Sequence, residues 1–277
     1  MCRFFVSAIA ICFSLTPTLA ASASFIWSVS GGIPTDIQPT VDSFRAFLGP
    51  LNPNLPQNGP ATGRREINWD GVPDSLADPN QLPGDFFNGS TPGRARGIAF
   101  TTPGSGFEVS ANAGIEPIAF SHSEDFKAFS AQRMFRAVDS TILDVYFFDP
   151  ADQVTRATTR GFGAVFNDVD VFGSSSLSFF DADDNLLFTQ NVLESVSGGM
   201  SFLGVGFSDS VIARVRIVAG NILIPPAAGP FEVDDQDGVV MDDFVFGEQA
   251  PLTVPIPSAI LLYGTILAGI GAFRRRQ

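Results

Sequence analysis

Short apolar stretches separated by turn residues fill the second half of the chain. The clearest of them predict strands at residues 141–148, 161–172, 176–180, 186–192, 211–218 and 239–246. Gly, Asp and Asn stand between these stretches, and those residues favour tight turns. Short strands at a spacing of roughly ten residues are the pattern of an all-β sandwich. We expect a jelly-roll-like β-sandwich over residues 66–248.

The preceding region, residues 24–65, is rich in Pro, Gly and Asn, above all at 49–56. Repeated proline removes backbone donors, so this region is predicted to be loop-rich, with at most an edge strand. A short ordered element is expected at 44–48. In the following part, 67–71 predicts a strand that runs into an Asp-Gly turn. The pieces 98–101 and 106–110, which flank Pro-Gly-Ser, predict a hairpin.

Both ends of the chain have the pattern of export signals. Arg3, an apolar run over 4–15 and the small residues at 20–23 predict a signal peptide over 1–23. After a predicted linker at 249–253, an uncharged Leu- and Gly-rich stretch at 259–273 ends in three arginines. This stretch is short for a bilayer, so residues 254–258 are counted with it. We predict a transmembrane helix over 254–277 whose arginines stay on the cytoplasmic side.

The C-terminal layout resembles the sorting signal of PEP-CTERM proteins. The residues that carry this resemblance are Val254, Pro255, Ile256, Pro257, Arg274, Arg275 and Arg276. The family's motif is Pro-Glu-Pro, and Ile256 stands here in the place of Glu. The resemblance implies cleavage by an exosortase-type sorting enzyme in an exopolysaccharide-producing Gram-negative bacterium. It further implies export across the inner membrane and display at the cell surface or in an extracellular matrix.

Segments of the middle are also similar to uncharacterised exported bacterial β proteins, many of which carry PEP-CTERM tails. The segments are 161–170, 201–205 and 240–244, and the likeness extends over about residues 65–248. No known activity comes with this resemblance, which bears only on the fold and the localisation of the protein.

Removal of the two predicted export signals would change the cysteine content and the net charge of the protein. Cys2 and Cys12 both lie in the predicted signal peptide, so the mature protein has neither a disulfide nor a Cys-based metal site. Four of the 16 basic residues leave with the ends, which sets 12 basic residues against 29 acidic ones and gives a formal net charge of −17. Such a charge excludes nucleic acid and anionic surfaces as partners. It suits solubility outside the cell, or divalent cations.

Asp181, Asp183 and Asn185 are a first candidate site for calcium. Their spacing matches the opening of a calcium loop. An EF-hand is excluded, because Leu186 stands where that loop needs Gly and Val192 where it needs Glu. The alternative is an ordinary hairpin turn, which Asp and Asn also favour.

Asp242 and Asp243, in the last predicted strand, are the second candidate. Strict alternation puts them on opposite faces, so one carboxylate joins an apolar surface whichever face points inward. A buried carboxylate needs a partner or a metal ion. The pair resembles the terminal strand of carbohydrate-binding jelly rolls, where an Asp can hold structural calcium. A salt bridge to Arg214 or Arg216, or a solvent-facing turn, is the alternative.

The residues offer little to an enzyme. No thiol remains, no zinc, nucleophile-elbow or phosphate-loop motif is present, and nothing places a serine beside the lone His122. We expect a non-enzymatic surface or matrix protein that is structural or associated with exopolysaccharide. One alternative is a calcium-dependent carbohydrate-binding module with Trp27 and Trp69 as stacking faces. The other is a glycoside hydrolase or lyase that uses two carboxylates.

Overall fold

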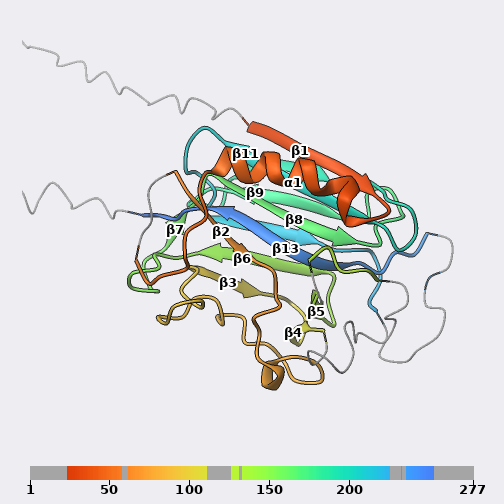
Figure 1. The fold of residues 1–277 in the computed structure, drawn as a ribbon, viewed down its shortest axis with the longest axis horizontal. Coiled ribbons are helices and arrows are strands. Elements are labelled where there is room, and N and C mark those ends of the chain that lie inside the picture. Colours follow the sequence, from red (N-terminus) through yellow and green to blue (C-terminus); the bar gives the residue numbers. More distant parts are fainter. Residues whose placement is uncertain are drawn as a thin grey trace, which may run out of the picture.

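Two β-sheets pack face to face, and one helix covers the outer face of the larger sheet (Figure 1). The structure is a computed structural model that describes residues 24–57, 62–110, 126–130, 133–224, 232 and 235–252. It is 41% strand and 9% helix, which confirms the prediction of a mainly β protein. In the described part of the chain, no helix is both long enough and apolar enough to cross a bilayer.

The larger sheet has seven strands in the order β1-β11-β8-β13-β5-β4, with β2 also paired to β13. Its strands are β1 (Ser24–Gly31), β2 (Arg64–Ile67), β4 (Gly106–Val109), β5 (Phe135–Val138), β8 (Gly161–Asn167), β11 (Met200–Phe207) and β13 (Val240–Gly247). The smaller sheet has five strands in the order β10-β9-β12-β6-β3. They are β3 (Ile98–Thr101), β6 (Ile142–Phe147), β9 (Ser176–Phe180), β10 (Leu186–Asn191) and β12 (Arg214–Val218).

Four further elements complete the fold. Helix α1 (Pro34–Leu48) lies on the larger sheet, a short 3-10 helix spans Asp74–Leu76, and β7 (Ala157–Thr158) pairs with β14 (Ala250–Pro251). The strand β14 lies inside the predicted linker at 249–253, so the linker takes part in the fold. Likewise, β2 begins two residues before the predicted start of the sandwich at 66.

The main core fills the space between the sheets and is dominated by phenylalanine. Its centre is Trp69, which is fully buried and stacks on Phe135 with ring centroids 4.0 Å apart. Phe244 of β13 meets the Trp69 ring edge-on at 5.1 Å. Burial in this core accounts for many of the chain's 28 phenylalanines, because each buried ring removes a large apolar area from water.

The predicted hairpin over 98–110 is wrong, although both of its strands exist. Strand β3 pairs with β6 in the smaller sheet, while β4 pairs with β5 in the larger one. Phe100 and Phe107 both point into the core from opposite sheets, with ring centroids 6.0 Å apart. The turn between them therefore bridges the two layers, because burying both rings requires the strands to face one another.

The prediction that residues 24–65 are loop-rich is also wrong, since they hold β1 and α1. Pro34 opens the helix, where a missing N–H costs nothing, and the Asp36 carboxylate accepts hydrogen bonds from the N–H groups of Gly32 and Ile33 at 3.0 and 3.2 Å. The buried residues recur at helical spacing: Ile37, Val41, Phe44 and Leu48. This apolar stripe overrides the proline content.

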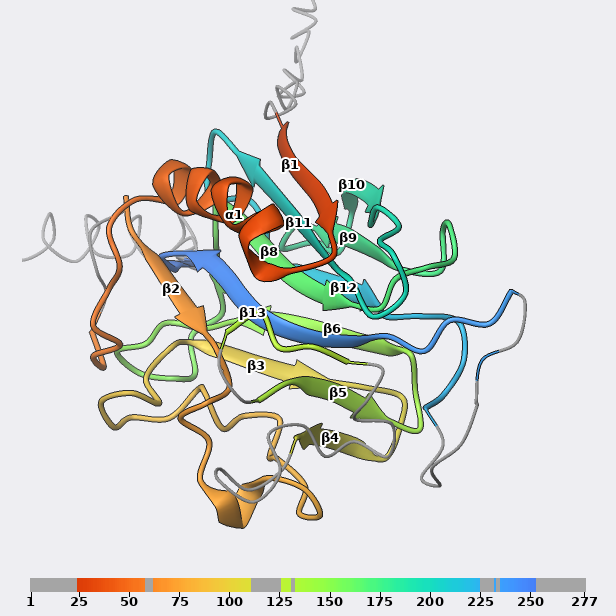
Figure 2. The ribbon, with the colours of Figure 1, turned by 45° about the vertical axis from the view of Figure 1, so that its right-hand side comes forward.

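Helix α1 lies on the larger sheet (Figure 2), over a groove that four glycines leave in β8 and β11. Gly161 and Gly163 of β8 lie beside Gly206 and Gly204 of β11. A Cβ at Gly204 would lie 3.0 Å from the Phe44 ring, and one at Gly206 only 2.3 Å from Phe47. The missing side chains let the aromatic residues of α1 approach the sheet backbone.

Replacing Gly204 by valine is expected to destabilise the protein by about 3 kcal/mol, because Phe44 must leave its place on the sheet. Urea unfolding of the full chain in detergent micelles measures this loss. Gly71→Val is the matched control, since a Cβ there meets nothing within 4 Å, and it should change stability by less than about 0.5 kcal/mol. Equal losses in both variants would contradict the role of the groove.

Candidate functional site

The Asp242–Asp243 pair lies at a β-bulge in β13. Opposite β8, Met241 pairs with Phe166 while Phe244 pairs with Ala164, so β13 has one extra residue at this point. A bulge resets the alternation of side chains. Consequently Met241 and Phe244 both face the main core, and the predicted division of the two aspartates between opposite faces is wrong. Both aspartates are buried, at 0% and 3% exposure.

Asp242 is held by backbone donors from a distant segment. Its Oδ2 accepts hydrogen bonds from the N–H groups of Phe129 at 2.6 Å and Ser130 at 3.2 Å. The Asp242 carbonyl, which the bulge takes out of the regular ladder, accepts one from Trp69 Nε1 at 3.0 Å. Both the side chain and the backbone carbonyl of Asp242 therefore have hydrogen-bond partners at the bulge.

Asp243 faces helix α1. Its Oδ1 accepts a hydrogen bond from the Ser130 hydroxyl at 2.7 Å, and its Oδ2 lies 3.2 Å from an Arg45 guanidinium nitrogen. Arg45 also bridges to Glu66 at 2.9 Å, and Arg64 joins Glu66 at 2.5 Å. The partner of Asp243 is therefore an arginine of the helix.

The arginines predicted as partners lie in the other sheet. Arg214 contacts Asp144 at 2.9 Å and Asp184 at 2.5 Å, and Arg216 contacts Asp144 at 2.7 Å. The two arginines neutralise the carboxylates of Asp144 and Asp184 on the outer face of the smaller sheet. None of these three contacts involves β13.

The pKa of Asp242 is raised well above its usual range. Burial is the largest cause, the charge of Asp243 adds to it, and the Phe129 N–H opposes it. The pKa of Asp243 is also raised by burial, against which the Ser130 hydroxyl and Arg45 act. A hydrogen bond between the two carboxyl groups raises the pKa of Asp242 and lowers that of Asp243. These directions, and the Arg45 guanidinium beside Asp243, favour the proton on Asp242 and the charge on Asp243.

This arrangement joins three parts of the fold. The pair links β13, the segment 126–130 and α1 through hydrogen bonds and one ion pair. General acid or base work requires the carboxyl to reach a substrate, and both side chains are buried. The chemistry it supports is a structural carboxyl–carboxylate contact.

The other predicted calcium residues form a hairpin turn between β9 and β10. Asp181 Oδ1 accepts hydrogen bonds from the N–H groups of Asp183 at 2.9 Å and Asn185 at 2.8 Å. The Asn185 side-chain amide donates to Asp181 Oδ2 at 3.0 Å. These contacts lower the pKa of Asp181 against the effect of burial. Asp181 and Asn185 are brought together as in an Asx turn, far along the chain from Asp242.

A further acidic group, which the sequence did not single out, lies where β8 ends and β13 begins. It consists of Asp168, Asp170, Glu232 and Asp237. Asp237 is fully buried, and its Oδ2 accepts hydrogen bonds from the Ser174 hydroxyl and, at 3.4 Å, from the Val171 N–H. Its Oδ1 is buried and has no hydrogen-bond partner in the described part of the chain.

The electrostatic environment of this group disfavours the ionised form of its carboxyl groups. Burial raises the pKa of Asp237 to about 6; the Ser174 hydroxyl opposes the shift, and the charge of Asp170 adds to it. Burial raises the pKa of Glu232 to about 7, and the charges of Asp168, Asp170 and Asp237 add to it. Carboxylates crowded together in this way resist ionisation. The signal in the sequence is the run of acidic residues at 232–237, where Asp is also a common turn residue.

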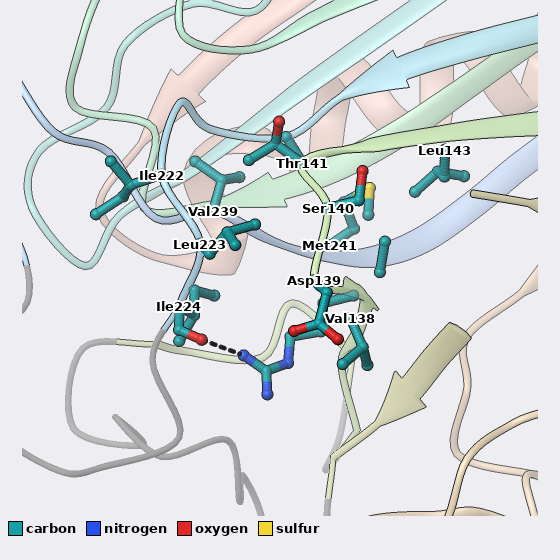
Figure 3. Close-up of a pocket in the computed structure, with 13 residues that line it drawn as sticks. Val138, Asp139, Ser140, Thr141, Leu143, Ile222, Leu223, Ile224, Val239 and Met241 are labelled. Carbon is teal, nitrogen blue, oxygen red and sulfur yellow. Dashed lines mark hydrogen bonds between the residues drawn. The ribbon is translucent and has the colours of Figure 1, made fainter. Parts of the chain in front are cut away.

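A pocket of about 120 Å³ opens between the sheets at the same end of the sandwich (Figure 3). Leu143, Val239 and Met241 form apolar parts of its wall. At the rim, the Arg136 guanidinium donates a hydrogen bond to the Ile224 carbonyl at 3.2 Å. The volume suits a few water molecules or a small ligand.

The remaining predicted residues either are packed in the fold or lie outside the described residues. Trp69 is fully buried, so it cannot offer a stacking face to a sugar, and Trp27 is packed edge-on against Phe44 at 5.2 Å. The sorting residues 254–257 and 274–276, the signal peptide and His122 lie outside the described residues. Sequence reasoning missed Arg45, Ser130 and Asp237, whose roles depend on contacts far apart along the chain.

Comparison of the chain with models of protein families, with curated proteins and with solved structures found no match. The PEP-CTERM resemblance of the C-terminal segment stays a prediction.

Proposed function

We propose that this chain is an exported protein that is processed at its C-terminal sorting signal and carries a non-enzymatic β-sandwich to the cell surface or extracellular matrix. The observation that supports this best is how both ends of the sandwich are tied. Ser24, the first residue after the predicted signal peptide, pairs with Phe207. Pro251, three residues before the sorting signal, pairs with Ala157. Cutting outside these pairs leaves every described strand pair in place.

A jelly-roll-like topology is part of this proposal. All pairs between the named strands are antiparallel, and β10, β11, β12 and β13 alternate between the two sheets. Such sandwiches serve as exported binding and structural modules. The net charge of −17 and the absence of cysteine after processing fit a solvated extracellular setting. Exopolysaccharide is the proposed partner, and the inner membrane and an exosortase-type enzyme act before release.

Changing Pro255 and Pro257 together to alanine is expected to stop processing, because the sorting enzyme would lose its recognition motif. In a Gram-negative host that has an exosortase, the wild type should appear in the surface or medium fraction as a shortened chain. The variant should stay in the membrane fraction at a greater mass. Immunoblotting of the fractions measures this difference.

Pro53→Ala with Pro56→Ala is the matched control, since both prolines are exposed in the described fold. That control should be processed like the wild type. A wild-type chain that stays uncut in the cell would contradict the export proposal. Sedimentation of the released chain with the host's exopolysaccharide tests the glycan association separately, and a chain left in the supernatant would contradict that part alone.

A further inference from the structure

Asp237 carries a buried oxygen that the fold leaves without a hydrogen bond. The residue has 0% exposure, and its Oδ2 is already fixed by the Ser174 hydroxyl and the Val171 N–H. The other oxygen, Oδ1, is buried with no partner among the described residues. Burying an unpaired carboxylate oxygen is costly, so native proteins normally give it a donor, a water molecule or a cation.

The charged groups around Asp237 favour a cation. The charged groups that act on it and on Glu232 are the carboxylates of Asp168, Asp170 and each other. In the part of the chain that the structure describes, Asp170, Glu232 and Asp237 form no ion pair. A positive charge placed here would offset repulsion among several carboxylates at once.

The group is also assembled from separate segments. Asp168 and Asp170 follow β8, and Asp168 Oδ1 accepts a hydrogen bond from the Gly198 N–H at 2.5 Å. Glu232 and Asp237 precede β13, and Glu232 Oε1 accepts one from the Gly238 N–H at 2.6 Å. A cation at this place would join two connections of the larger sheet.

We propose that the acidic group around Asp237 binds a calcium ion, with Asp237 Oδ1 as the central ligand. Within the described residues, no three acidic or histidine side chains already converge as a metal-binding group. Two carboxylates, Asp237 and Glu232, would therefore share the ion with backbone carbonyls and water. Calcium accepts six to eight oxygen ligands in irregular geometry, whereas magnesium demands a regular octahedron. The absence of nitrogen and sulfur ligands in the group disfavours zinc and copper.

Binding would stabilise the wall of the neighbouring pocket. The Asp237 carbonyl accepts hydrogen bonds from the N–H groups of Asn221 at 2.9 Å and Ile222 at 3.3 Å, and Asn221 Oδ1 accepts one from the Asp237 N–H. Ile222 and Val239 both line the pocket. An ion on the Asp237 side chain thus fixes the backbone on which this wall is built.

The test is thermal unfolding of the full chain in detergent micelles at neutral pH. Adding about 10 mM CaCl₂ after EDTA treatment should raise the Tm by roughly 3–5 °C, for a Kd of about 1 mM, which is typical of extracellular sites. Asp237→Asn should lose this gain. In EDTA the same variant should be at least as stable as the wild type, because the amide removes a charge from a crowded acidic group.

Two controls locate the effect. Asp181→Asn, in the hairpin turn, should keep the calcium gain, and NaCl at the same ionic strength should not reproduce it. If Asp237→Asn does not fold, Glu232→Gln carries the test, with a weaker calcium gain expected. Isothermal titration calorimetry should give one site. A wild type without a calcium response, a gain that survives Asp237→Asn, a gain as large in Glu232→Gln as in the wild type, a gain lost in Asp181→Asn, or an equal gain from NaCl would overturn the proposal.

Discussion

Changing Asp242 to alanine is expected to lower the free energy of unfolding by about 3–5 kcal/mol. The substitution leaves the partly buried N–H groups of Phe129 and Ser130 without the oxygen that accepts their hydrogen bonds at 2.6 and 3.2 Å. Each buried donor that loses its partner costs about 1–3 kcal/mol. A cavity at a fully buried position adds to the loss. Equilibrium unfolding in urea measures the difference.

Asp242→Asn is the matched control and is expected to cost less than about 1 kcal/mol. An asparagine has the shape of a protonated aspartic acid. Its carbonyl can accept the two backbone hydrogen bonds, and its amide can donate to Asp243. A loss as large as that of the alanine variant would show that Asp242 is charged in the fold, contrary to the direction of its pKa shift.

Local pattern was sufficient for strands whose pairing is also local. The hairpin of β9 and β10 joins residues that are close in sequence, and its turn residues Asp181 and Asn185 bond to each other. The pattern failed where partners are distant. The strands β3 and β4 were found, but their assignment to different sheets depends on burying Phe100 and Phe107 between layers.

Helix α1 illustrates a signal that was present but lay elsewhere in the chain. Pro34 begins this segment and Pro39 lies inside it, and the surrounding region 24–65 is rich in Pro and Gly, which argue against a helix. The glycines of its groove, Gly161 and Gly163 in β8 with Gly204 and Gly206 in β11, recur every second residue and so lie on one face. A sheet face stripped of side chains in this way needs an element packed closely on it.

The candidate site was half predictable for the same reason. Asp242 and Asp243 stood out because charged residues interrupt an apolar strand. Their partners could not be read from the sequence, because Ser130 and Arg45 are 113 and 198 residues away from Asp243. The bulge that turns both carboxyl groups to one side arises from the pairing of β13 with β8. A prediction from strict alternation of side chains does not include such a bulge.

Removing the buried cation Arg65 is the second large effect that we expect. Arg65→Met should lower the free energy of unfolding by about 3–5 kcal/mol, because it takes the positive charge away from a buried carboxylate. Arg65 and Glu248 have side-chain exposures of 0% and 1%, and their closest atoms are 2.7 Å apart. The same guanidinium donates hydrogen bonds to the carbonyls of Leu55, Gln57 and Ala95. It therefore ties β2 to the segments on either side of it.

Arg216→Met provides the matched control, because Arg216 also forms an ion pair but has a side-chain exposure of 46%. Water and salt screen such a pair, so the control should lose less than about 1 kcal/mol. The double variant Arg65→Met with Glu248→Leu should be more stable than Arg65→Met alone, since the carboxylate that lost its cation is then gone. Urea unfolding of the four chains measures these differences. A double variant less stable than the single one would mean that the backbone hydrogen bonds of Arg65, and not its charge, carry the effect.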